Sequence, residues 1–139
     1  MERYGITDQS VQRGILESAR VIAVVGFSAD PARTSYRIGR FLQAAGYTVY
    51  PVNPTVSKID NDICYPTLAD VPEPIDIVNV FRRPEYLLGV VEAAIAVGAR
   101  CVWAQLGISD VAAAQRAQEA GMPLIMNNCI KVTYQYLMK

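Results

Sequence analysis

Histidine is absent from this sequence of 139 residues. Its absence removes the commonest proton shuttle near neutral pH and the most frequent protein ligand for zinc. The three cysteines, Cys64, Cys101 and Cys129, form no CxxC pair. An odd number of cysteines in separate segments is typical of reduced thiols in a cytosolic protein rather than of a disulfide framework. We therefore expect neither a zinc site nor structural disulfides.

A net charge is also absent, because 13 basic residues balance 13 acidic ones. The chain thus has no overall positive field that would attract nucleic acid or an anionic membrane. The first ten residues, MERYGITDQS, lack the apolar core of a signal peptide, and no apolar run approaches the roughly 20 residues of a membrane span. We expect a cytoplasmic protein that binds neither nucleic acid nor a membrane. This composition also permits a homodimer or an unidentified protein partner.

Hydrophobic residues, by contrast, make up 52% of the chain, enough for a core in one domain over residues 1–139. Short β-branched runs alternate with longer amphipathic runs, which predicts a doubly wound parallel sheet in three layers, α/β/α, with the first strand central. The predicted strands are Val21–Phe27, Tyr47–Val52, Ile63–Tyr65, Asp76–Phe81, Cys101–Leu106 and Pro123–Asn127. The predicted helices are Thr7–Ala19, Thr34–Ala45, Pro84–Val97, Ser109–Ala120 and Ile130–Leu137.

Ligands of doubly wound sheets bind beyond the carboxyl ends of the strands, where the strand order reverses. The loop after the first strand, in VVGFSADPARTSYRIGRFLQAAG, fits that role. Gly26 allows a sharp turn, and the free amides of Thr34 to Tyr36 would attract an anion at the start of the next helix. Arg33 adds a positive charge, so a phosphate or pyrophosphate is the expected ligand. The alternative is an ordinary turn between a strand and a helix, which a single glycine does not exclude.

The second predicted strand ends in Val52, Asn53 and Pro54, without the acidic residue that usually holds the ribose of NAD. The chain also lacks the GKS or GKT sequence of a P-loop. Both absences disfavour the commonest dinucleotide and nucleoside triphosphate sites. A different phosphorylated ligand is therefore favoured.

Four segments together resemble the small, single-domain CoA-binding proteins, which are related in fold to the nucleotide-binding domain of the succinyl-CoA synthetase alpha subunit. These segments are VIAVVGFSADPARTSYRIGRFLQAAGYTVYPVNP, CYPTLADVPEPIDIVNVFRRPE, VWAQLGI and MNNCIKV. The resemblance runs from about Ile15 to Val132. It implies a Rossmann-like CoA-binding fold, with coenzyme A or an acyl-CoA lying across the point where the strand order reverses.

The resemblance also implies a set of ligand contacts. The pyrophosphate would meet backbone groups of Gly26, Phe27 and Ser28, together with Arg33 and Ser35. The adenosine would lie between Val52, Asn53 and Pro54 on one side and Val80, Phe81 and Arg82 on the other. Lys58 and Arg82 are equal candidates for the 3′-phosphate, and Gln105 and Gly107 would bind the pantetheine arm. For Val52 and Val80 the favoured alternative is an ordinary core position.

Cys129 follows the last predicted strand and could form a mixed disulfide with the thiol of coenzyme A. The favoured alternative is a small buried hydrophobic residue. The chain departs from the family pattern nearby, with Asn128 where relatives often have arginine, and Thr133 and Tyr134 where they often have glutamate and histidine. Any activity of relatives that depends on this segment is not implied here.

We expect a small non-catalytic module that binds coenzyme A or an acyl-CoA in a sensor, carrier or regulatory role. Succinyl-CoA synthetase works through a phosphorylated histidine on another domain, and this chain has no histidine. The carboxylates Asp30, Asp62 and Glu85 show no paired spacing for acid and base catalysis. The alternatives are a cysteine-dependent CoA-disulfide or acyl-CoA enzyme, and an NAD-type redox protein.

Overall fold

The computed structural model describes residues 5–138, and residues 1–4 and 139, which include the start of the segment MERYGITDQS, lie outside it. Its helices are α1 Gln9–Ser18, α2 Thr34–Ala44, α3 Leu87–Ala96, α4 Val111–Ala120 and α5 Ile130–Leu137. Its strands are β1 Val21–Val25, β2 Thr48–Val52, β3 Lys58–Ile59, β4 Asp62–Ile63, β5 Ile77–Val80, β6 Val102–Ala104 and β7 Leu124–Ile125. Short 3-10 turns span Leu68–Asp70 and Pro84–Tyr86.

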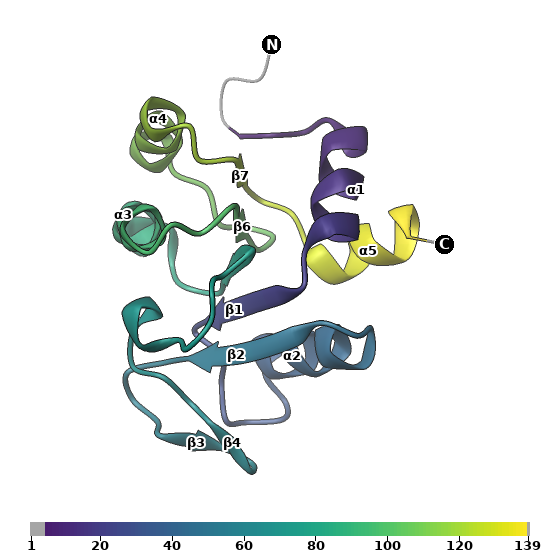
Figure 1. The fold of residues 1–139 in the computed structure, drawn as a ribbon, viewed down its shortest axis with the longest axis vertical. Coiled ribbons are helices and arrows are strands. Elements are labelled where there is room, and N and C mark those ends of the chain that lie inside the picture. Colours follow the sequence, from purple (N-terminus) through teal and green to yellow (C-terminus); the bar gives the residue numbers. More distant parts are fainter. Residues whose placement is uncertain (1–4, 139) are drawn as a thin grey trace.

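Five strands form one parallel sheet in the order β2-β1-β5-β6-β7 (Figure 1). The prediction that the first strand is central was wrong, because β5 takes the middle position and only β2 lies beyond β1. From β1 the chain moves outward to β2 and then returns to β5 on the other side of β1. The strand order therefore reverses between β1 and β5, which is where a doubly wound sheet binds its ligand.

Helices cover both faces of this sheet, as predicted. Figure 1 shows α1, α2 and α5 on one side of the strands and α3 and α4 on the other. Strand β1 is buried along its whole length, so its side chains serve two cores. Ile22 and Val24 pack with α1, α2 and α5, whereas Ala23 and Val25 pack with α3 and α4. The alternation follows from the two-residue period of a strand.

The prediction of a strand at Ile63–Tyr65 was wrong in its bounds. The structure forms a small antiparallel hairpin from β3 and β4 instead, and only Tyr65 continues as a parallel bridge to Val52. Asp60 turns the hairpin with a φ of 54°, a left-handed conformation that aspartate tolerates better than most residues. Lys58, expected in a loop, therefore lies in β3.

The carboxyl-terminal ends of the predicted helices match the structure because glycines mark them. Gly121 ends α4 in the left-handed conformation, and Gly98 follows α3 in the same conformation. Helix α4 starts at Asp110, whose carboxylate accepts a hydrogen bond from the Ala113 amide at 2.9 Å. The predicted helix from Pro84 instead begins with the 3-10 turn and becomes α-helical at Leu87.

Packing between Phe27 and Gly39 fixes the first loop against α2. The Phe27 side chain is fully buried and meets the ring of Tyr36 edge to face, with centroids 5.9 Å apart. A methyl group added at Gly39 would overlap the Phe27 ring. Gly39 therefore provides the space that lets the loop after β1 lie directly on the helix.

We expect Gly39→Ala to lower the free energy of unfolding by about 1–3 kcal/mol, because the fully buried Phe27 ring would have to move. Chemical denaturation measures this change. Gly14→Ala is the matched control, since Gly14 lies in α1 with nothing within 4 Å of an added methyl group. That variant should gain about 0.5–1 kcal/mol from helix propensity. Equal effects of the two variants would contradict the packing argument.

Candidate ligand-binding site

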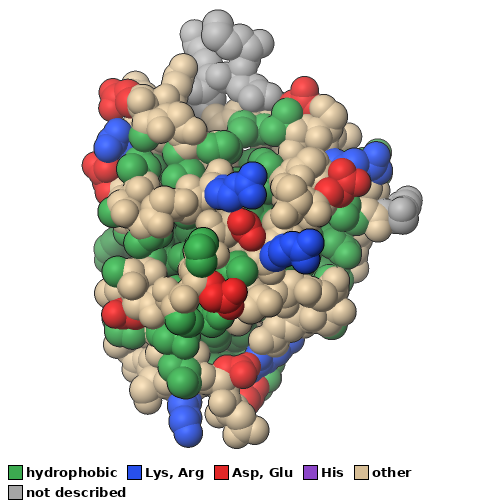
Figure 2. Space-filling model, viewed as in Figure 1, with side chains coloured by type: hydrophobic (Ala, Val, Ile, Leu, Met, Phe, Trp, Pro, Cys, Tyr) green, Lys and Arg blue, Asp and Glu red, His purple; other side chains and the backbone are tan. Residues whose placement is uncertain are grey.

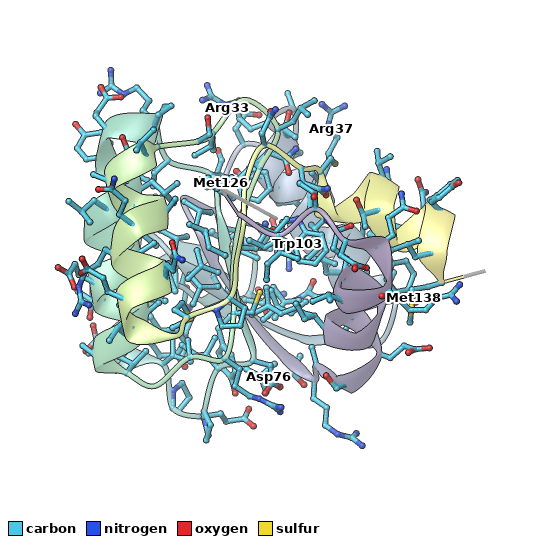
Figure 3. All side chains as sticks on the ribbon, turned by 90° about the horizontal axis from the view of Figure 1, so that it is seen from above. Arg33, Arg37, Asp76, Trp103, Met126 and Met138 are labelled. Carbon is cyan, nitrogen blue, oxygen red and sulfur yellow. The ribbon has the colours of Figure 1, made fainter. Side chains whose placement is uncertain are left out.

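The two ends of the sheet can be told apart by their side chains. At the amino ends of the strands, the Asp76 carboxylate accepts hydrogen bonds from the amides of Arg20 and Val21 at 2.8 and 2.9 Å. Figure 3 shows Asp76 at one end of the molecule and Arg33 and Arg37 at the other. The two arginines thus lie at the carboxyl ends of the strands.

The loops after β1 and β5 come into close contact where the strand order reverses. Gly26 has a φ of 89°, and a methyl group added there would lie 2.7 Å from the Phe81 carbonyl oxygen. Its amide donates to the Val52 carbonyl oxygen at 2.8 Å. Only glycine fits this position, because both the backbone conformation and the contact exclude a side chain. The loops after β1, β2 and β5 are thereby held together.

The loop after β1 is organised by its own polar side chains. The Ser28 amide donates to the Ser35 hydroxyl at 2.9 Å, and the Asp30 amide donates to the Ser28 hydroxyl at 3.0 Å. The Ala32 amide in turn donates to the Asp30 carboxylate at 2.9 Å. The amides of Gly26 and Ser28, which were expected to contact the phosphate, already hydrogen-bond within the protein and shape the loop. The Ser35 hydroxyl accepts from the Ser28 amide and keeps its own hydrogen as a donor.

Three amides at the start of α2 keep their hydrogen-bonding capacity. Within residues 5–138, the amides of Thr34, Ser35 and Tyr36 have no acceptor, and no side chain caps the helix. The residue at the cap position is Arg33, which is exposed. An eleven-residue helix also places a partial positive charge at this end. Donors without an acceptor, a helix dipole and an exposed guanidinium therefore lie together at the start of α2, an arrangement that suits an anion.

On the α3 side of the same edge lies a cavity of about 270 Å³. It is lined mainly by apolar groups from the ends of β1 and β2, the first 3-10 turn and α3. The lining residues are Val25, Val52, Pro54, Pro66, Thr67, Leu68, Arg82, Tyr86, Gly89, Val90 and Ala93. The structure thus brings together Val52, Pro54 and Arg82, three residues predicted for the adenosine.

Arg82 is half-buried at the rim of this cavity, and its guanidinium lies 4.6 Å from the centre of the Tyr86 ring. Its neighbour Arg83 is exposed. Val80 is fully buried in the sheet core and does not line the cavity. Phe81 contributes its carbonyl group to the contact with Gly26.

Asn53 connects the loops after β1 and β2. Its side-chain amide donates to the Phe27 carbonyl oxygen at 3.0 Å, and its side-chain oxygen accepts from the amide and hydroxyl of Thr55 at 3.0 and 2.8 Å. Both the nitrogen and the oxygen of the carboxamide therefore contact other loop residues. Asn53 thus positions the loops, and the second hydrogen of its side-chain amide is not used by these contacts.

Lys58 is exposed on the β3–β4 hairpin and does not line the cavity with Arg82. The hairpin is attached to α2 by Arg40, which forms ion pairs with Asp60 at 2.8 Å and Asp62 at 2.7 Å. Tyr36 donates to the same Asp60 oxygen at 2.6 Å. Hydrogen bonds from Tyr36 and Arg40 lower the pKa of Asp60. The two ion pairs thus hold the hairpin against α2. Lys58 is exposed on this hairpin.

On the other side of the crevice, the loop after β6 carries Gln105 and Gly107. The Gly107 amide donates to the Asn127 side-chain oxygen at 2.6 Å, so this amide is not free for a ligand. The Gln105 side-chain oxygen is buried and has no hydrogen-bond partner among residues 5–138. An unpaired buried acceptor is costly, and a donor from a ligand or water would relieve that cost.

Cys129 lies at the cap position of α5 and is half-buried. Cys64 and Cys101 are buried, and burial raises the pKa of both thiols, that of Cys101 to about 12. Cys129 is therefore the most accessible of the three thiols, and it lies at the carboxyl edge.

Within the described residues, no group of three histidine, cysteine or acidic side chains could hold a metal ion. None of the helices in residues 5–138 is both long and apolar enough to span a membrane.

The sequence prediction missed the α3 wall of the cavity. Tyr86, Val90 and Ala93 recur at intervals of four and three residues, which places them on one face of a helix. That period was available in the sequence. It was assigned to an ordinary crossover helix because nothing in the pattern distinguishes a cavity wall from a core face.

Comparison with known proteins agrees with this geometry. A family model described as a CoA binding domain matches residues 20–135. The protein YneT of Bacillus subtilis (strain 168) is 43% identical over 120 residues, which cover 86% of this chain and 89% of YneT. A hypothetical protein from Pyrococcus horikoshii OT3 is 33% identical, with a TM-score of 0.92 over 100% of this chain and 99% of that one.

A larger relative is the dinucleotide-forming acetyl-coenzyme A synthetase 1 of Candidatus Korarchaeum cryptofilum. Its apo structure is 30% identical, with a TM-score of 0.67 over 77% of this chain and 26% of that one. The same fold thus forms a part of a much longer enzyme. Because the family model spans most of the sequence, this chain belongs to the CoA-binding domain family.

Proposed function

We propose that this protein binds coenzyme A across the crevice between β1 and β5, as a non-catalytic module. The observation that carries the proposal is that two half-sites flank the same glycine. The uncapped start of α2 with Arg33 lies on one side of Gly26, and the apolar cavity at Arg82 lies on the other. Coenzyme A has the matching order of groups, with its diphosphate between an aromatic base and a flexible arm.

The diphosphate is assigned to the α2 half-site. Free amides of Thr34, Ser35 and Tyr36 can each donate to a phosphate oxygen, and the helix dipole favours negative charge there. Arg33 supplies a charge-assisted hydrogen bond. The loop of Ser28 and Asp30 holds this arrangement before the ligand arrives, which reduces the entropy lost on binding.

The adenine is assigned to the cavity beside α3. Its apolar walls, Val52, Pro54, Leu68 and Val90, suit the faces of a flat base. Arg82 lies at the rim, where a guanidinium can stack on the base or bind the 3′-phosphate. Lys58 does not line the cavity, and for this reason we favour Arg82 as the residue that binds the 3′-phosphate.

The non-catalytic assignment is supported by the roles of the candidate acids and bases. Asp30 accepts a hydrogen bond within its loop, and Asp62 pairs with Arg40. The acetyl-coenzyme A synthetase of Korarchaeum has this fold as only 26% of its length. We therefore propose that the isolated module senses or carries the coenzyme.

Mass spectrometry of the gently purified protein distinguishes this proposal from its alternatives. We expect non-covalently bound coenzyme A or an acyl-CoA. A covalent adduct that is lost on reduction, and absent from Cys129→Ala, would instead support the cysteine-dependent enzyme. Bound NAD would support the redox protein.

Arg33→Ala should weaken the binding of coenzyme A by about 1.5–3 kcal/mol, the value of a hydrogen bond to a charged group. Isothermal titration calorimetry at fixed salt measures this loss. Arg100→Ala is the matched control, because Arg100 is also exposed but lies at the opposite edge beside Asp76. An unchanged dissociation constant for Arg33→Ala would remove Arg33 from the site.

Arg82→Ala should abolish the preference for coenzyme A over 3′-dephospho-coenzyme A, because the variant lacks the cation assigned to that phosphate. Lys58→Ala should keep the preference. Competition titrations with the two ligands measure it for each variant. The opposite pattern would assign the 3′-phosphate to the hairpin instead.

A further inference from the structure

A second cavity, of about 490 Å³, lies between the start of α1 and α5. We call it the α1–α5 groove, and its walls include Ile6, Gln9, Met126, Val132 and Tyr136. Val132 and Tyr136 are more than 60% exposed, which is unusual for large apolar side chains. None of the described residues that line the groove carries a charge. Neither the sequence motifs nor the family match gives this groove a role.

The groove opens at the same edge of the sheet as the coenzyme site. Met126, Asn127 and Asn128 follow β7 directly and form its mouth. Figure 3 shows Met126 toward the same end of the molecule as Arg33, away from Asp76. In the sheet, β7 is three strands from β1. At about 4.8 Å for each step, the mouth lies roughly 14 Å along the edge from Gly26.

That separation matches the arm of coenzyme A. The pantoate, β-alanine and cysteamine units together have the length of three to four extended residues, roughly 10–14 Å. With the diphosphate at α2, an arm that runs past Gln105 brings its sulfur to the end of β7. Whatever group the sulfur carries would then enter the α1–α5 groove.

Two carboxamides at the mouth have side-chain nitrogens that stay available. The Asn127 oxygen accepts from the Gly107 amide at 2.6 Å, and the Asn128 oxygen accepts from the Thr133 hydroxyl at 2.6 Å. Because the Gly107 amide can only donate, the orientation of the Asn127 carboxamide follows from its hydrogen bond. Neither side-chain nitrogen has a partner among residues 5–138. Both remain donors at the entrance of the groove.

Asn127 is also held in the left-handed conformation, with a φ of 53°. Outside glycine this conformation is uncommon and carries strain, and such residues cluster at ligand sites. Asparagine tolerates it better than most residues. The strain is consistent with a side chain whose direction matters for binding.

We infer that the α1–α5 groove binds the acyl group of an acyl-CoA, with the thioester carbonyl oxygen accepting from Asn127 and Asn128. A thioester carbonyl accepts hydrogen bonds and donates none, so it matches the two available donors. The uncharged lining favours a short, uncharged acyl group and disfavours a second carboxylate, which would be desolvated without a cation. This inference rests on the proposed binding of coenzyme A, and it specifies the acylated form as the preferred ligand.

Calorimetry with coenzyme A, acetyl-CoA, butanoyl-CoA and succinyl-CoA tests the inference. The two uncharged acyl forms should bind about three- to tenfold more tightly than coenzyme A, the value of one net hydrogen bond between uncharged groups. Succinyl-CoA should show no gain. Equal affinity for coenzyme A and both uncharged acyl forms would overturn the inference and leave the proposed function intact. Failure of all four ligands to bind would overturn the proposed function itself.

Asn127→Asp keeps the acceptor for the Gly107 amide and replaces the free donor with a carboxylate oxygen. It should abolish the preference for acetyl-CoA and change the affinity for coenzyme A by less than about twofold, since the phosphates lie beyond a Debye length. Gln115→Glu, an exposed position on α4, is the control that adds the same charge and should keep the preference. A preference that survives in Asn127→Asp would exclude Asn127 as the donor and overturn the assignment.

Nuclear magnetic resonance of the unmodified protein gives an independent measurement. The side-chain NH₂ signals of Asn127 and Asn128 should shift when acetyl-CoA replaces coenzyme A, because only the thioester offers the carbonyl oxygen. The side-chain NH₂ signal of Asn61, in the hairpin turn, should not shift. Unchanged Asn127 and Asn128 signals would overturn the inference whatever the variants show.

Discussion

The contact between Gly26 and the Phe81 carbonyl oxygen determines most of the geometry at the binding edge. It lies where the strand order reverses, so the loops after β1 and β5 leave in opposite directions from one point. A side chain at Gly26 would separate these loops. Without that approach, the start of α2 and the cavity beside α3 would no longer border the same crevice.

The loop after β1 satisfies its own polar groups but leaves the start of α2 open. Ser28, Asp30 and Ser35 hydrogen-bond to loop amides, whereas the first three amides of α2 have no acceptor within the described residues. A residue with a capping oxygen at the position of Arg33 would have occupied one of these amides. An arginine there cannot accept, so it leaves the amides free and adds a charge of the sign that binds phosphate.

The proposed site has parts on both faces of the sheet. The cavity for the base belongs to the face covered by α3, and the α1–α5 groove belongs to the face covered by α1 and α5 (Figure 1). Only at the carboxyl edge are both open to one extended ligand. The opposite edge is different in character, and Figure 2 shows acidic side chains interspersed among the basic ones on one surface of the molecule. Mixed charges of this kind offer a polyanion no net attraction.

The sequence by itself determined the parallel α/β architecture, the helix ends at Gly98 and Gly121, and the start of α2 at Thr34, because each follows from local pattern or backbone conformation. Only the tertiary structure decided that β5 is the central strand and that residues 58–63 form a hairpin. It also decided which predicted groups have partners, since Ser28 and Ser35 hydrogen-bond within the first loop and Asn53 bonds to Phe27 on another segment. Cavities between elements leave no periodic trace in a sequence, so only the folded chain shows that Tyr86 lines the cavity beside α3. The same holds for hydrogen bonds between segments, such as those that leave the side-chain nitrogens of Asn127 and Asn128 available.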